Sequence, residues 1–118
     1  MDPFDFGAFR AAYGGPDPDA WAAFYAEDAE WIEYRYSAPP AAPHRMEGRE
    51  RIRVVLEQVV AAGRRAELSE VIHAPGRAAF RVDVELPDGR RIVEHTMIWT
   101  EGGAITRQVD VEAWDPAP

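Results

Sequence analysis

The second half of the chain alternates between apolar and polar residues, which is typical of β-strands that bury one face. Four runs follow this pattern and are rich in β-branched and aromatic residues: 66–74, 77–86, 90–99 and 104–114. Pro75-Gly76 separates the first two runs, and Asp88-Gly89 and Gly102-Gly103 separate the others. Asp-Gly and Gly-Gly pairs favour two-residue hairpin loops. The pattern therefore predicts four consecutive antiparallel strands joined by tight turns.

Two-residue loops would also fix which residues face each other. They pair Pro87 with Arg90 and Glu101 with Ala104, and this register places His95 directly opposite Asp110. Opposed side chains of neighbouring strands lie about 5 Å apart. We therefore expect a histidine–carboxylate pair on a sheet face that is otherwise mostly apolar. The expected members of that face are Phe80, Val82, Val84, Leu86, Val93, Met97, Trp99 and Trp114, together with the polar Gln108 and Glu112.

The opposite face of these strands mixes apolar and charged residues. It is expected to carry Ile92, Thr96, Ile98, Val109 and Val111 beside Arg81, Asp83, Glu94 and Arg107. A half-apolar, half-charged sheet face of this kind is typical of an interface. We therefore expect it to form a homodimer contact.

The first half of the chain is predicted to begin with two short helices. Asp2-Pro3 and Asp17-Pro18 each place a capping aspartate before a proline at the first helical position. Aromatic residues follow at helical spacing: Phe6, Phe9 and Tyr13 in the first helix, and Trp21, Phe24 and Tyr25 in the second. The second helix is expected to end near Asp28.

A strand, a loop and a long helix are predicted next. The run 29–36 alternates, so Trp31, Glu33 and Arg35 share one face. The proline-rich segment 38–47 is predicted to be a loop, long enough to act as a lid. Apolar residues then recur at helical spacing between Gly48 and Gly63: Ile52, Val55, Leu56, Val59 and Val60.

These elements predict one α+β domain over residues 1–118, a curved and mostly antiparallel sheet wrapped around three helices. The net charge of −8 disfavours nucleic acid and anionic membranes as partners. The chain has no cysteine, which excludes thiol chemistry, and its 13 basic residues are all arginine, which excludes a Schiff-base lysine. His44, His73 and His95 lack metal-ligand spacing, so no metal site is expected. The beginning of the chain does not resemble a signal peptide, and we expect a cytoplasmic protein without a cofactor.

The order of elements resembles the nuclear-transport-factor-2-like (NTF2-like) superfamily, which includes SnoaL-like polyketide cyclases, ketosteroid isomerases and limonene-type epoxide hydrolases. The resemblance rests on "AFYAEDAEW", on "HRMEGRERIR" before the long helix and on the closing "GGAITRQVDVEAW". It implies a cone-shaped, cystatin-like fold and a homodimer. The fold hosts many chemistries, so the resemblance leaves the function open.

Two candidate site residues follow from the resemblance. Epoxide-hydrolase-like members carry an aspartate on the last strand that helps activate water, and Asp110 stands at the matching position. Their first strand carries an aromatic and a polar residue, which Trp31 and Glu33 match. Those members also use an Arg-x-Asp pair on the penultimate strand, where "RRIVEHT" has no aspartate. Ketosteroid isomerases pair a base with a tyrosine and a protonated aspartate, and Tyr13 is a candidate for the tyrosine.

The leading hypothesis is a cofactor-free isomerase, cyclase or hydrolase that acts on a small hydrophobic carbonyl, lactone or epoxide compound. Asp110 would remove a proton or activate water, His95 would orient it or relay the proton, and Glu33 would act as an acid. The expected ligand-binding residues are Tyr13, Trp21, Tyr25, Trp31, Phe80, Met97, Trp99, Gln108 and Glu112. The alternatives are a structural His–Asp pair, a Glu33 that pairs with Arg35 or Arg107, and aromatic residues that only fill the core. The protein would then be a ligand-binding or protein-interaction module without turnover.

Overall fold

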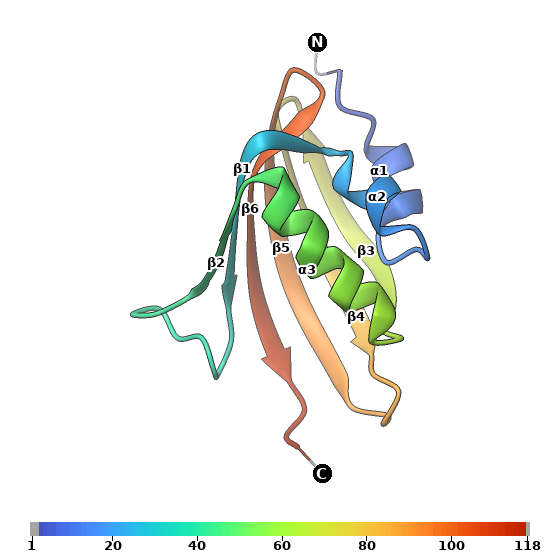
Figure 1. Ribbon diagram of the computed structural model, residues 1–118, viewed down its shortest axis with the longest axis vertical. Coiled ribbons are helices and arrows are strands. Elements are labelled where there is room, and N and C mark those ends of the chain that lie inside the picture. The colour runs from blue at the N-terminus through green and yellow to red at the C-terminus, as the bar shows by residue number, and fades with distance from the viewer. Residues whose placement is uncertain (1–2, 118) are drawn as a thin grey trace.

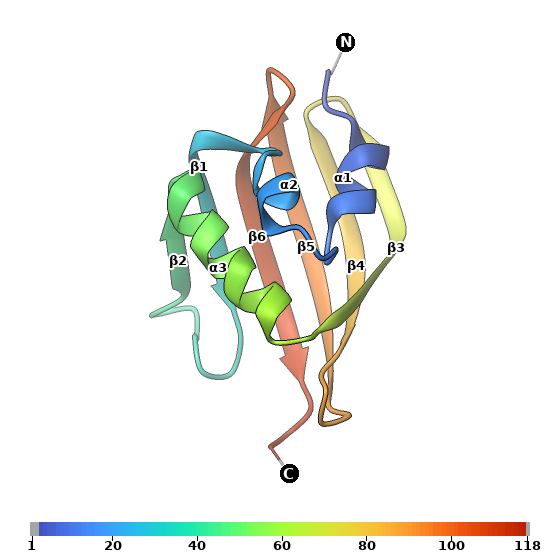
Figure 2. The ribbon, with the colours of Figure 1, turned by 45° about the vertical axis from the view of Figure 1, so that its right-hand side comes forward.

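Six strands form one curved sheet, and three helices cover one of its faces (Figures 1 and 2). The computed structural model describes residues 3–117. In chain order the elements are α1 (Phe6–Ala12), α2 (Pro18–Ala22), β1 (Tyr25–Tyr34), β2 (His44–Glu47), α3 (Arg49–Ala61), β3 (Arg65–Ala74), β4 (Arg77–Glu85), β5 (Arg91–Glu101) and β6 (Ala104–Trp114). The sheet order is β2-β1-β6-β5-β4-β3, antiparallel except where β1 lies parallel to β6. This is the predicted mostly antiparallel α+β architecture.

The two short helices begin with aspartate caps. The Asp5 side chain accepts a hydrogen bond from the Ala8 backbone N–H, whereas the predicted cap Asp2 lies outside the described residues. Asp17 caps α2 and Pro18 is its first residue, as predicted. The expected continuation of α2 to Asp28 is wrong, because the backbone of residues 24–25 joins the sheet. The Phe24 carbonyl accepts a hydrogen bond from the Ile105 N–H at 2.8 Å, and Tyr25 begins β1.

The long helix α3 packs its apolar stripe against the sheet, as predicted. Ile52 and Leu56 are fully buried, and Gly63, at φ +72°, follows the end of the helix. The predicted loop 38–47 is shorter than expected, because its last four residues form β2. Met46 of β2 pairs with Trp31 of β1 and is fully buried. Burial of this side chain explains why the segment forms the edge strand of the sheet.

The turn between β4 and β5 is one residue longer than predicted. The Leu86 N–H donates to the Arg90 carbonyl and the Gly89 N–H donates to the Leu86 carbonyl, both at 2.9 Å. Gly89 has φ +89°, so Pro87-Asp88-Gly89 is a three-residue loop with glycine in the left-handed position. A one-residue shift in register moves every side chain of a strand to the other face. All of β5 is therefore turned over relative to the prediction.

The turn between β5 and β6 is the predicted two-residue loop, with Glu101 opposite Ala104. A bulge follows it, because Thr100 pairs with Ile105 whereas Trp99 pairs with Arg107. The extra residue in β6 offsets the shift made by the first turn. Gln108, Asp110 and Glu112 consequently keep the buried positions predicted for them.

The predicted His95–Asp110 pair is wrong. His95 is exposed and pairs with Arg81 and Val111 on the uncovered face, while Thr96 stands opposite Asp110. The same shift places Val93, Met97 and Trp99 on the uncovered face. Ile92, Glu94, Thr96 and Ile98, expected there, are instead buried under the helices.

The uncovered face keeps a mixed apolar and charged character. Ile72, Met97 and Val111 are among its exposed apolar side chains. Trp99 lies between two guanidinium groups, with the Cζ atoms of Arg77 and Arg107 at 4.5 and 4.9 Å from its ring centre. The homodimer through this face stays a prediction. Within residues 3–117, no helix has the length and apolar character needed to cross a membrane.

Candidate functional site

A cavity of about 210 Å³ lies between α3, the N-terminal helices and the covered face of the sheet. Its apolar wall comes from valines of α3 and from aromatic rings, and its polar wall comes from carboxyl groups of three strands. The lining residues central to the site are Tyr13, Trp21, Trp31, Glu33, Glu94 and Asp110, and Arg35, His44 and Arg64 also line the cavity. Apolar cavities with a few convergent polar groups are the usual form of small-molecule sites.

Asp110 is fully buried at the inner end of this polar wall. The Trp31 indole N–H donates to its Oδ2 at 2.8 Å, and the Gln108 side-chain amide donates to its Oδ1 at 3.1 Å. The Tyr25 hydroxyl donates to the other end of the Gln108 amide at 2.5 Å, which fixes the orientation of that amide. Burial raises the pKa of Asp110 to about 7, and the negative charge of Glu112 adds to this effect. The group therefore changes protonation near neutral pH.

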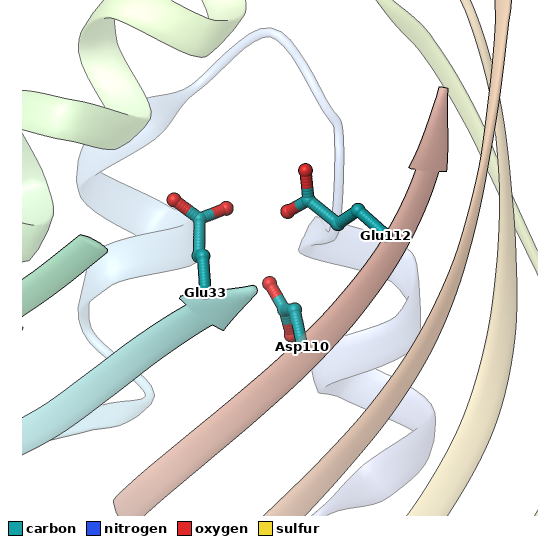
Figure 3. Close-up of side chains that lie close together, drawn as sticks. All are labelled: Glu33, Asp110 and Glu112. Carbon is teal, nitrogen blue, oxygen red and sulfur yellow. The ribbon is translucent and has the colours of Figure 1, made fainter. Parts of the chain in front are cut away.

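Glu33 and Glu112 face Asp110 from β1 and β6, and Figure 3 shows the three carboxyl groups pointing toward one another. One oxygen of each lies within 4.8 Å of the others. Burial raises the pKa of Glu33, and burial together with Glu33 raises the pKa of Glu112 to about 8. Close carboxyl groups cannot all ionise at once, so the cluster holds a proton near pH 7. The same three oxygens are near enough together to contact one cation.

Two side chains tie this cluster to its surroundings. The His44 Nδ1 lies 2.9 Å from a Glu33 oxygen, so the histidine beside a site carboxylate is His44 and not His95. The Trp114 indole N–H donates to Glu112 at 2.8 Å. Both contacts join the polar wall to the rim of the cavity.

Glu94 is a site residue that the predicted register places on the opposite face. It is only 6% exposed and lines the cavity. Burial and the charge of Asp110 raise its pKa well above the usual value. A sequence signal for it existed, because Pro-Asp-Gly is typical of a type I turn followed by a left-handed glycine, the three-residue hairpin loop.

Tyr13 and Trp21 bring further donors to the cavity wall. Burial raises the pKa of Tyr13 well above its usual value, with Glu94 as the largest charge effect, so its hydroxyl stays protonated. The Trp21 indole N–H is buried and has no hydrogen-bond partner in the described part of the chain. The two rings pack at 4.6 Å between centres. Buried donors without partners are costly, and a ligand acceptor would satisfy them.

Two arginines that the sequence interpretation did not assign to the site lie at the mouth of the cavity. Arg35 follows β1 and Arg64 lies between α3 and β3. Their Cζ atoms lie 5.4 and 5.5 Å from the centre of the Trp114 ring. The alternation along 29–36 places Arg35 beside Glu33, but no local pattern distinguishes Arg64 from other arginines.

The remaining predicted ligand-binding residues do not line the cavity. Tyr25 stacks parallel to Trp31 at 5.8 Å and supports it from behind, as Gln108 supports Asp110. Phe80 belongs to the aromatic core, packed edge-on against Tyr13 and Phe6. Met97 and Trp99 lie on the uncovered face, so placing them at the site is wrong.

Comparison with solved structures identifies the fold. A protein from Kribbella flavida DSM 17836, provisionally named a ketosteroid isomerase, aligns with a TM-score of 0.77 at 20% identity over 96% of this chain and 79% of that chain. An NTF2-like protein of unknown function from Mesorhizobium loti aligns with a TM-score of 0.78 at 20% identity, over 92% and 87% of the two chains. The epoxide hydrolase/cyclase-like enzyme SalBIII of salinomycin pyran-ring formation aligns with a TM-score of 0.72 at 17% identity, over 92% and 87%.

Comparison at the level of sequence identifies the family. No curated protein sequence matches this chain. The model of the SnoaL-like domain, however, matches residues 6–108, which extend from α1 into β6 and include every central cavity residue except Asp110. The chain therefore belongs to the SnoaL-like domain family and has the NTF2-like fold.

Proposed function

We propose that this protein is a cofactor-free enzyme that transfers a proton on a small hydrophobic carbonyl compound, with Asp110 as the base. The observation that carries the proposal is the position of Asp110, a fully buried carboxyl group on the wall of a cavity, with a pKa of about 7. A general base is most effective when its pKa lies near the working pH. Trp31 and Gln108 hold both oxygens of Asp110 in place, which favours a fixed direction of attack.

Tyr13 and Glu94 are the proposed donors to the substrate oxygen. Both line the cavity, and burial raises the pKa of each, which favours the protonated form that can donate a hydrogen bond. A neutral carboxylic acid beside a tyrosine is an effective way to stabilise negative charge on an oxygen in an apolar site. In this proposal Glu94 takes the acid role that the sequence interpretation gave to Glu33.

The proposed reaction has two steps. Asp110 removes a proton from the carbon next to the carbonyl group, and the C–H electron pair forms the C=C bond of an enolate. The carbonyl oxygen gains the negative charge and accepts hydrogen bonds from Tyr13 and Glu94. Where the substrate carries a C=C bond beside that carbon, Asp110 then returns the proton to the far carbon of this bond, which moves the double bond into conjugation with the carbonyl group and restores the carboxylate.

Epoxide opening is a second candidate, favoured by the protonated cluster beside Asp110. Asp110 would take a proton from water as the water oxygen bonds to an epoxide carbon. The epoxide C–O bond breaks, and its oxygen takes the proton that Glu112, with a pKa of about 8, shares with Glu33, the neighbouring residue that lines the cavity. The structural likeness to SalBIII supports this candidate at the level of the fold.

Hydrogen–deuterium exchange tests the main proposal with simple carbonyl compounds in place of the physiological substrate. Small ketones and lactones are incubated with the protein in D2O, and loss of the C–H signal beside the carbonyl is followed by proton NMR. We expect exchange above the buffer rate for at least one compound and a decrease of about a hundredfold or more for Asp110→Asn. His95→Gln is the matched control, because His95 is the exposed histidine on the other face, and it should exchange at the wild-type rate.

Two results would contradict the proposal. One is exchange that Asp110→Asn retains, which would place the base elsewhere. The other is binding of the compounds to both proteins with no exchange in either, which would indicate the alternative of a ligand-binding module. For the epoxide candidate, the corresponding measurement is diol formation from a panel of small epoxides by the same two variants.

A further inference from the structure

Arg35 and Arg64 lie at the mouth of the cavity without an acidic partner. Among the described residues, no carboxylate oxygen lies within 4.0 Å of either guanidinium group, whereas Arg53, Arg81 and Arg90 each contact at least one. The Nε atoms of Arg35 and Arg64 are buried and have no hydrogen-bond partner in the described part of the chain. A charged donor that is buried without an acceptor destabilises the fold. Both residues line the cavity, so the missing acceptor would come from the space inside it.

Trp114 holds the two side chains in place. The guanidinium carbon of Arg35 lies 5.4 Å from the centre of this ring, and that of Arg64 lies 5.5 Å from it. These distances are within the range of a cation–π contact. The indole N–H of Trp114 donates a hydrogen bond of 2.8 Å to Glu112, and this bond orients the ring. The donors of both arginines are therefore positioned by the protein before any ligand binds.

The charge at the mouth of the cavity favours an anion. Two carboxyl groups of the cluster in Figure 3 interact electrostatically with these arginines: Glu33 with both of them, and Glu112 with Arg35. The pKa of Glu112, about 8, keeps it neutral at pH 7. One carboxylate, Glu33, then faces two guanidinium groups and the neighbouring His44. Two guanidinium groups against one carboxylate leave the mouth with a surplus of positive charge.

We propose that Arg35 and Arg64 bind a carboxylate group of the ligand at the mouth of the cavity, so that its apolar body extends inward toward Asp110. The guanidinium fork matches a carboxylate through parallel N–H···O bonds. The description of this ligand as a substrate rests on the proposed function; the carboxylate site does not. A dianionic phosphate could accept from the same donors, but Glu33 would repel its second negative charge. A singly charged carboxylate is therefore the favoured ligand.

Three isosteric probes separate the possible charges of the ligand. Benzoate, benzamide and benzamidine share one ring and a planar head group but carry negative, neutral and positive charge. We expect benzoate to bind about tenfold or more tightly than the other two, as charge-assisted hydrogen bonds imply. Binding is measured by NMR titration of the arginine Nε–H signals. Only the Nε–H signals of Arg35 and Arg64 should shift on saturation.

Single substitutions test which arginines are responsible. Arg64→Gln should weaken benzoate binding about tenfold. Arg65→Gln is the matched control, because the neighbouring Arg65 side chain is 84% exposed and lies opposite Glu85. It should bind benzoate like the wild type. If Arg35→Gln fails to fold, the Nε–H shift of Arg35 in the wild type still reports its contact.

Several outcomes would overturn the proposal. Equal binding of benzoate and benzamide would remove the role of charge, and tighter binding of benzamidine would show that the carboxyl cluster selects a cation. Tighter binding of phenylphosphonate than of benzoate would make a phosphate the better ligand. Asp110→Asn should keep benzoate binding, so the carboxylate site and the proposed catalysis can fail independently.

Discussion

The two faces of the sheet carry similar residue types, but burial and the direction of carboxyl pKa shifts differ between them. On strand β5, Glu94 and His95 are neighbours in sequence, yet Glu94 is buried against the cavity and His95 is exposed. Burial raises the pKa of Glu94, whereas on the uncovered face a hydrogen bond from Arg81 lowers the pKa of Asp83. The difference comes from the helices, which exclude water from one face and leave it on the other. A carboxylate in water finds partners easily, but a buried one retains its proton.

The largest expected effect is on stability, and it differs between side chains packed on the two faces of the sheet. Ile98 is fully buried and Met97, its neighbour, is 42% exposed on the uncovered face. Ile98→Ala should lower the free energy of unfolding by about 2–5 kcal/mol because it leaves a cavity in the core. Met97→Ala should lower it by about 1 kcal/mol or less. Urea unfolding followed by circular dichroism measures both, and equal losses would contradict the assignment of β5 faces.

The raised pKa values of the buried carboxyl groups should make the stability of the protein depend on pH. The pKa of Asp110 is raised to about 7 and that of Glu112 to about 8, whereas both have a pKa near 4 in the unfolded chain. Between about pH 4 and pH 8 the folded state therefore holds protons that the unfolded state has already lost. The stabilisation is complete below about pH 4 and is lost as pH rises through 7 to 8, by an amount of the order of a few kcal/mol.

The measurement is the Tm between pH 5.5 and 9, where we expect a continuous decrease. Glu94→Gln should flatten the decrease, because it removes one of the buried carboxyl groups whose pKa is raised. Asp83→Asn is the control from the uncovered face and should leave the slope unchanged in this range, since the pKa of Asp83 is lowered. A Tm that rises with pH in the wild type would show that these carboxyl groups are ionised in the folded protein.

On the covered face, the hydroxyl group of Tyr13 should affect the rate of deuterium exchange. Tyr13→Phe removes one proposed donor to the substrate oxygen and should slow deuterium exchange about a hundredfold, the usual effect of losing one such donor. The substitution keeps the buried aromatic ring of Tyr13, so the Tm should stay nearly unchanged. Wild-type exchange by Tyr13→Phe would remove this residue from the mechanism.

The smallest expected effect concerns the turn that decides which face β5 presents. Gly89 has φ +89° and open space around its Cα, so a side chain there meets strain in the backbone but no neighbour. Gly89→Ala should therefore lower stability by about 1 kcal/mol. Gly89→Asn should cost less, because asparagine tolerates the left-handed conformation better. Equal effects of the two substitutions in urea unfolding would contradict this account.

Much of the fold could be predicted because its signals are local. The cap at Asp17, the stripe of α3 with Ile52 and Leu56, and the turn at Gly102-Gly103 depend on residues a few positions apart. The position of Asp110 on the buried face also followed from alternation within β6. The end of α2 could not be predicted in this way, since the pairing of Tyr25 with Ile105 joins residues far apart in the chain.

The candidate site was predicted only in part for the same reason. Trp31, Glu33 and Asp110 line one cavity as expected, because the face of each depends on the parity of its own strand. Glu94 and His95 exchanged places because their faces depend on the length of one turn. Arg64 reaches the cavity only because α3 ends beside Trp114, which no pattern near Arg64 indicates.

The sequence by itself determined the three helices and five of the six strands, though not strand β2 or the end of α2. It also determined that one face of the last strand carries three polar side chains. Periodicity and turn chemistry act over a few residues, so they can be recognised without the fold. Only the tertiary structure decided the register between strands, the partner of each carboxyl group and the lack of an acidic partner for Arg35 and Arg64 among the described residues. Those properties depend on which distant side chains share a volume closed to water, because burial raises a pKa and isolates a charge only once the helices cover the sheet.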